Sequence, residues 1–131
     1  MMVLLSNLIP ENERTEIKYN RASIIVHDFM ELVNNDSGIH RSVSYYADKL
    51  CYSAKYLSSI VKQSTGQTPI QIISQHTIKQ IKYKLRNSDL SIKELADYFD
   101  FPNPSFFGKF VKTHLGTSPM QYRLLAAKES E

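Results

Sequence analysis

Apolar residues recur at helical spacing along most of this chain, and turn residues divide them into short units. Between about Arg21 and Asn35 the apolar side chains fall three or four residues apart, which predicts an amphipathic helix ending at the Asp-Ser-Gly sequence of residues 36–38. The same reasoning predicts helices over about 43–50, 54–65, 69–87, 91–99 and 104–115, and a last helix from 119 onward. The chain is therefore expected to be all-α.

Residues that start and end helices lie at the boundaries of these segments. Hydroxyl or amide side chains suited to N-capping stand at the start of most of them, and a proline occupies the first helical position of three. Glycine follows two of the helices, where a left-handed residue is common. The expected N-caps include Ser53, Thr68, Ser91 (in a capping box with Glu94) and Asn103, and the glycines are Gly66 and Gly116.

One stretch of the sequence occurs twice. An Ala-Asp pair at residues 47–48, followed by Gly-Gln-Thr-Pro at 66–69, returns as Ala-Asp at 96–97 and Gly-Thr-Ser-Pro at 116–119. The offset is 49 at the Ala-Asp pair and 50 at the glycine, so the second copy has one additional residue. We place that residue in a longer turn between Phe99 and Asn103.

Each copy has the form of a helix-turn-helix: a short helix, a turn and an amphipathic second helix. Ala47 and Ala96 fit a close crossing of the two helices, because a larger side chain would displace the second one. The predicted fold is all-α, with two helix-turn-helix subdomains joined by a long connector helix. The expected division is a linker or N-terminal stub at 1–20, the first subdomain at 21–67, the connector at 68–87, the second subdomain at 88–128 and an acidic tail at 129–131.

The net charge of +3 is unevenly distributed. Residues 1–38 have three basic and six acidic side chains, whereas residues 39–128 have thirteen basic and five acidic ones. The positive charge therefore lies with the repeat, as a phosphate-binding surface requires. A merely solubilising face is the alternative interpretation of the charge alone.

Enzymatic chemistry fits this sequence poorly. The four histidines lie on separate predicted elements with no i, i+4 pair, and no glycine-rich phosphate loop is present. The single cysteine, Cys51, is expected to be a half-buried turn residue, and it indicates a reduced, cytoplasmic compartment. No apolar run is long enough to span a bilayer, so no membrane partner is expected. We expect no enzyme activity, no cofactor and no metal site.

Certain stretches of both copies form a recognisable pattern. They are Tyr46–Leu50, Ser53, Tyr56-Leu57, Lys62 and Gly66 in the first copy, and Phe101–Lys112, Gly116–Pro119 and Tyr122-Arg123 in the second. With these residues the sequence resembles the AraC/XylS family of transcription regulators. The resemblance covers roughly residues 25–125 and includes both halves, the spacer length and the terminal Pro-x-x-Tyr-Arg at 119–123.

The resemblance implies a monomeric seven-helix domain that binds double-stranded DNA, its third and sixth helices entering successive major-groove segments. It implies base contacts from two sets of residues, Lys55, Ser58 and Ser59 in the first unit and Pro104, Ser105, Gly108 and Lys109 in the second. The phosphate contacts it implies are Ser53, Lys62, Asn103 and Lys112. Exposed lysines and short surface side chains are the alternative interpretation of these positions.

The two sets of base contacts depart from the family pattern. Gly108 stands where a groove-facing side chain is expected, Pro104 lacks a donor, and the first unit has no arginine on its reading face. We therefore expect thymine-methyl contacts and DNA bendability to contribute to selectivity, and the second unit to be the weaker reader.

A different functional class is left open by the sequence: a helical protein-interaction module that contacts RNA polymerase or another regulator and binds DNA only weakly. Family members usually have a sensor domain ahead of the DNA-binding domain, and about twenty residues cannot build one. The chain is accordingly expected to be a fragment of a longer regulator, with a compact stand-alone regulator as the alternative.

Overall fold

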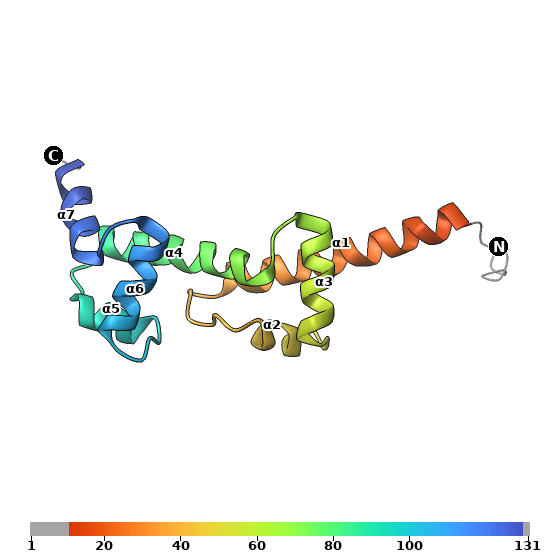
Figure 1. The fold of residues 1–131 in the computed structure, drawn as a ribbon, viewed down its shortest axis with the longest axis horizontal. Helices are drawn as coiled ribbons and strands as arrows, with labels where there is room; N and C mark the ends of the chain where they lie inside the picture. The colour runs from red at the N-terminus through yellow and green to blue at the C-terminus, as the bar shows by residue number, and fades with distance from the viewer. Residues whose placement is uncertain (1–10, 130–131) are drawn as a thin grey trace.

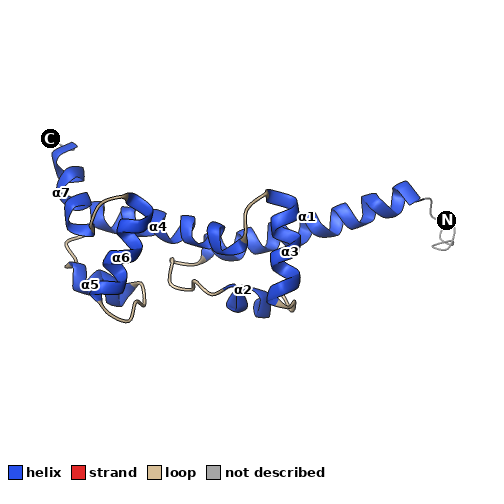
Figure 2. Ribbon diagram, viewed as in Figure 1, coloured by secondary structure: helices blue, strands red, loops and turns tan. Residues whose placement is uncertain are grey.

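The computed structural model describes residues 11–129, with side chains from residue 20 onward, and this part of the chain is all-α. Helices and connecting loops account for it without any strand (Figure 2). The helices are α1 (Glu11–Asn35), α2 (Val43–Lys49), α3 (Ala54–Thr65), α4 (Pro69–Asn87), α5 (Ile92–Tyr98), α6 (Pro104–Leu115) and α7 (Pro119–Glu129).

The start of α1 differs from the prediction. The helix begins at Glu11, ten residues before the expected start near Arg21. Residues 11–20 are rich in helix-forming Glu, Arg and Lys, but they lack the apolar periodicity on which the prediction relied. Within the predicted linker, residues 1–10 lie outside the described part of the chain, as do residues 130–131 of the predicted acidic tail.

Two separate hydrophobic cores lie along α4, and this helix contributes to both. Its first half places Ile72 and Ile73 in a core with α1, α2 and α3, and its second half places Ile81 and Leu85 in a core with α5 and α6. Figure 1 shows the two units at opposite ends of α4, with α3 and α6 both lying across the long axis of the molecule. The helix expected to be a connecting rod is thus an integral part of each unit.

The structure confirms the four predicted N-caps. Side-chain oxygens of Ser53, Thr68, Ser91 and Asn103 each accept from the backbone amide three residues on. Thr68 also forms a capping box with Gln71, which the sequence analysis did not anticipate. Gly66 and Gly116 end α3 and α6 at φ values of 79° and 81°, where a side chain would be strained.

The turns of the two helix-turn-helix units have the same backbone path at their start. Cys51 and Asp100 both adopt a positive φ, 64° and 59°, and the next amide in each case donates to the carbonyl of the buried alanine, Ala47 or Ala96. These pairs keep the offset of 49, whereas the caps Ser53 and Asn103 differ by 50. The additional residue therefore lies between Phe101 and Asn103, within the predicted interval.

Candidate nucleic-acid interface

The second helices of the two units, α3 and α6, present the same surface. From 55 to 70 and from 105 to 120 every residue has the same burial class as its counterpart fifty positions on. Leu57 and Val61 are fully buried in the first unit, as are Phe107 and Val111 in the second. Of the two adjacent phenylalanines near the start of α6, Phe107 is buried and Phe106 is exposed. Both helices expose a polar face of equal extent.

The small residues predicted at the helix crossings are buried in the two cores. Ala47 and Ala96 are 1% and 0% exposed, each in the core of its own unit. A larger side chain at either position would separate the first helix of the unit from the second. This packing holds α3 and α6 in place as the two candidate reading helices.

The residues predicted to contact bases all lie on or beside these polar faces. Lys55 and Ser59 are exposed on α3, and Ser58 is half-buried beside them. On α6, the exposed residues are Pro104, Ser105 and Lys109, and Gly108 is half-buried. A Cβ added at Gly108 would meet nothing within 4 Å, so packing does not require a glycine there.

The caps predicted to hold phosphates are already engaged through their acceptor atoms. Ser53 Oγ accepts from Tyr56 N at 3.0 Å, and Asn103 Oδ1 accepts from Phe106 N at 3.0 Å. The serine hydroxyl hydrogen and the asparagine amide NH2 remain available as donors. Both side chains can therefore stabilise a helix start and donate to an anion at once.

The two lysines predicted to hold phosphates differ. Lys62 Nζ donates to the carbonyl of Gly66 at 2.8 Å and so caps the C-terminus of its own helix. Lys112 occupies the corresponding exposed position of α6. The two lysines start from different local environments, although the sequence makes them equivalent.

Exposed aromatic rings are the feature that the sequence analysis missed. Tyr56 is 41% exposed and Phe106 is 55% exposed at corresponding positions of α3 and α6, whereas Phe107 lies in the core and Phe110 packs against it. The helical period places them beside the predicted base contacts, which is the signal that identifies them. Phe106 lines a shallow groove of about 340 Å³ along α6, together with Phe101, Pro102, Lys109, Phe110, Thr113 and His114.

The Tyr-Arg pair that ends the family-like motif has a structural role. Arg123 donates from Nε to the carbonyl of Leu85 at 3.0 Å and from a terminal nitrogen to that of Leu90 at 2.6 Å. Tyr122 accepts from Arg86 Nε at 2.8 Å. Both side chains thus tie α7 to the end of α4 and the loop before α5.

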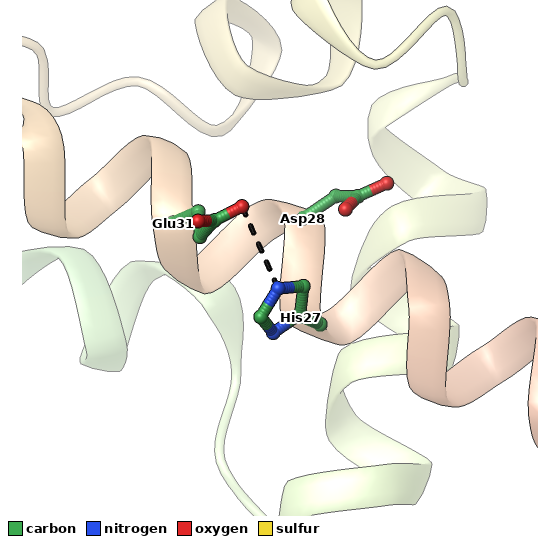
Figure 3. A group of neighbouring side chains, drawn as sticks. All are labelled: His27, Asp28 and Glu31. Carbon is green, nitrogen blue, oxygen red and sulfur yellow. Dashed lines mark ion pairs between the residues drawn. The ribbon is translucent and has the colours of Figure 1, made fainter.

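A histidine and two carboxylates lie close together on α1. His27 Nε2 is 3.5 Å from a carboxylate oxygen of Glu31, and Asp28 lies nearby (Figure 3). All three are exposed, and such groups are common on helices without an ion. Cys51, expected to be half-buried, is exposed in its turn.

Comparison with known proteins bears on this arrangement. The profile of a family described as "Helix-turn-helix domain" matches residues 46–124, which include both units and the helix between them. The chain belongs to the AraC family of helix-turn-helix transcription regulators. Among its relatives, the Msm operon regulatory protein of Streptococcus mutans is 31% identical over 119 residues, which cover 91% of this chain and 40% of that protein. The multiple antibiotic resistance protein MarA of Salmonella typhimurium is 23% identical, over 80% of this chain and 83% of MarA.

Solved structures show the same fold as this AraC-family chain. The C-terminal domain of AraT, a response regulator from Geobacillus stearothermophilus, superimposes with a TM-score of 0.69 at 25% identity, covering 77% of this chain and 84% of that domain. The DNA-binding domain of AdpA, solved in complex with a target DNA, gives a TM-score of 0.64 at 22% identity, covering 82% and 94%. Among the described residues, no helix is both long and apolar enough to cross a membrane.

Proposed function

We propose that this chain is the DNA-binding domain of a transcription regulator, with α3 and α6 entering successive major-groove segments of one asymmetric site. The observation that supports this most directly is the residue-by-residue match of burial between the two helices, which leaves two equal polar faces. Each helix has 12 residues, or about 18 Å of length, and a major groove about 12 Å wide admits a helix.

The proposed division of labour follows from the reach of each side chain. Lys55 and Lys109 project far enough to donate to base edges, whereas Ser58 and Ser59 reach only close neighbours. Ser53, Asn103, Lys62 and Lys112, with the free amides at the helix starts, would hold phosphates and fix the register.

The exposed aromatic rings add a further element to this proposal. Tyr56 and Phe106 offer apolar surface next to the predicted base contacts, and apolar side chains can contact the thymine methyl group. Neither reading face includes an arginine, the preferred bidentate partner of guanine. We therefore expect preferred sites rich in A·T pairs.

The salt dependence of binding tests the proposal. We expect a duplex selected from random DNA to bind with a log–log salt slope of about −1.8 if Lys62 and Lys112 each neutralise one phosphate, which is about a 3.5-fold loss of affinity per doubling of salt. Fluorescence anisotropy at several salt concentrations measures this slope. A flat response would contradict DNA binding and favour the protein-interaction module.

Four lysine substitutions separate the two kinds of contact. Lys62→Ala and Lys112→Ala should weaken binding to all duplexes alike and reduce the salt slope by about 1 each, whereas Lys55→Ala and Lys109→Ala should change the preference among sites by roughly 1 to 3 kcal/mol. Lys82→Ala, an exposed lysine of α4 outside both reading helices, is the matched control. Unchanged site preference in both Lys55→Ala and Lys109→Ala would show that other residues read the bases.

Further partners of the whole protein belong to the same proposal. The chain spans only 40% of the length of the Streptococcus relative, which supports a sensor domain elsewhere in the protein. We also propose that the DNA-bound domain contacts RNA polymerase. Transcription in vitro from a promoter that contains the selected site, with and without the protein, tests this contact.

A further inference from the structure

The loop between α1 and α2 connects the first unit to the second. We name residues 36–42 the bridging loop. Gly38, at a φ of 87°, lies so close to α4 and to the residue that follows α5 that an added Cβ would be 3.2 Å from Cβ of Gln80 and 3.4 Å from the ring of Phe99. His76 Nε2 lies 2.7 Å from the carbonyl oxygen of Asp36. The loop thus lies against α4 and reaches the core of the second unit.

Arg41 makes the contact of this loop with the turn before α6. Its guanidinium donates to the carbonyls of Phe99 and Asp100, the latter at 2.9 Å, across 58 and 59 residues of sequence. The same group lies 3.9 Å from the centre of the Phe101 ring. The chain enters α6 directly after these residues. Arg41 of the first unit therefore holds the segment that leads into the reading helix of the second.

Hydrogen bonds and a ring stack hold the bridging loop against the first unit. Asp36 Oδ2 accepts from the amides of Gly38 and Ile39 at 2.9 and 2.8 Å, and the hydroxyl of Tyr46 donates to the carbonyl of His40 at 2.8 Å. The ring of His40 also stacks on Tyr45, with the centroids 3.8 Å apart. Because its backbone is fixed to the first unit, the loop can transmit the position of that unit through Arg41.

A second connection is needed because the two cores are separate. Apolar residues of α4 in the first core end at Ile73, and those that pack against the second core begin at Ile78, leaving about 7.5 Å of helix between them. A single helix resists stretching but bends and twists, and Arg41 joins the units away from the helix axis. Helix α4 and the Arg41 contacts together fix the orientation of the second unit relative to the first, which α4 alone would not do.

We propose that Arg41 is a positioning residue that sets the orientation of α6 relative to α3, so that the pair of helices accepts one spacing between its two half-sites. The inference rests on the proposed function. Inserting one base pair between the half-sites rotates one of them by about 34° and moves it by about 3.4 Å. A rigid pair of helices cannot follow this change, whereas a loosely connected pair can.

A measurement without DNA tests the positioning directly. Spin labels at Gln63→Cys and Thr113→Cys, corresponding exposed positions of α3 and α6, report the distance between the helices in a Cys51→Ser background that removes the single native cysteine. We expect one narrow distance distribution in the parent and a broadened or shifted one in Arg41→Met, with unchanged helix content by circular dichroism. Arg21→Met, an exposed arginine of α1, is the matched control and should leave the distribution narrow.

Binding to spaced sites provides the functional measurement. We expect one inserted base pair to reduce the affinity of the parent by at least about tenfold, or about 1.4 kcal/mol, and that of Arg41→Met by less than about threefold. A purely structural role would lower affinity equally at every spacing and leave the profile parallel to that of the parent. Arg41→Lys keeps the charge but not the planar fork that bonds two carbonyls, so it should give an intermediate profile.

The outcomes separate this inference from the proposed function. An unchanged distance distribution in Arg41→Met, or a parallel spacing profile, overturns the positioning role even if the parent binds DNA tightly. If Arg41→Met fails to fold, the distance distribution and the spacing profile of Arg41→Lys test the positioning role instead. Failure of the parent to bind any duplex contradicts the proposed function, and the distance measurement still decides whether Arg41 fixes the two units.

Discussion

The two units share a scaffold but are completed in different ways. The start of α4 completes the hydrophobic core of the first unit, where Ile73 is fully buried among apolar side chains. At the corresponding position of the second unit, fifty residues on, Arg123 on α7 bonds to backbone carbonyls instead. The loops before the units' first helices differ too: Ser91 and Glu94 form a capping box, whereas Ser42 makes no side-chain cap and Asp36 organises the loop. Duplication thus preserved the reading surface more closely than the interactions that support it.

Removing the buried apolar side chain with which α4 completes the first core should have the largest effect on stability. We expect Ile73→Ala to lower the free energy of unfolding by about 3 kcal/mol, because a fully buried side chain is replaced by a cavity. Urea denaturation measures the change. Ile70→Ala, on the same helix but 48% exposed, should stay within about 0.5 kcal/mol of the parent. A similar loss in both variants would mean that this face of α4 is not the core of the first unit.

Removing the Arg123 hydrogen bonds that complete the second unit should reduce stability by less. Arg123→Ala loses hydrogen bonds from a charged donor to the carbonyls of Leu85, Leu90 and Ser88, and we expect a loss of about 2 kcal/mol because water replaces part of them. Hydrogen exchange should show faster opening of α5, α6 and α7 while α2 and α3 stay protected. Equal acceleration of hydrogen exchange in both units would contradict the idea that Arg123 stabilises only the second unit.

The sequence predicted the helices because their caps and periodicity are local properties. Ser53, Asn103 and the glycines after α3 and α6 act within one turn of helix, so their roles follow from neighbouring residues. The first ten residues of α1 were missed because they lack apolar periodicity. Arg41 and Arg123 bond to carbonyls more than thirty residues away, and nothing in the local sequence indicates those partners. The polar faces of α3 and α6 were predictable for the same local reason, whereas their DNA contacts stay predictions.

The bridging loop should make the first unit sensitive to acid. Burial opposes ionisation of Asp36, but hydrogen bonds from the ring and amide of His40 and the amide of Ile39 outweigh it and lower the pKa of this carboxyl group. A lowered folded-state pKa means that the ionised carboxylate stabilises the fold above the unfolded value of about 3.9 and loses this effect as pH falls through the folded value.

The substitution Asp36→Asn tests this dependence. We expect a loss of about 1.5 kcal/mol at neutral pH, since the amide oxygen is a weaker acceptor for the loop amides. The difference from the parent should disappear below the folded-state pKa, where the parent carboxyl is protonated as well. Asp89→Asn, in the corresponding loop of the second unit, is the control. A difference that persists unchanged at low pH would show that the charge of Asp36 does not organise the loop.

The smallest expected effect concerns the reading faces themselves, at the position where Ser58 of the first unit corresponds to Gly108 of the second. Because an added Cβ at Gly108 meets nothing within 4 Å, Gly108→Ala should stabilise α6 by roughly 0.5 to 1 kcal/mol. Gly116→Ala is the contrasting control, since its φ of 81° strains any side chain and should make the same substitution destabilising. If Gly108→Ala also weakens binding to the selected duplex, the glycine gives up helix stability for close approach of the α6 backbone to DNA. Unchanged affinity would place the contact surface of α6 elsewhere on the helix.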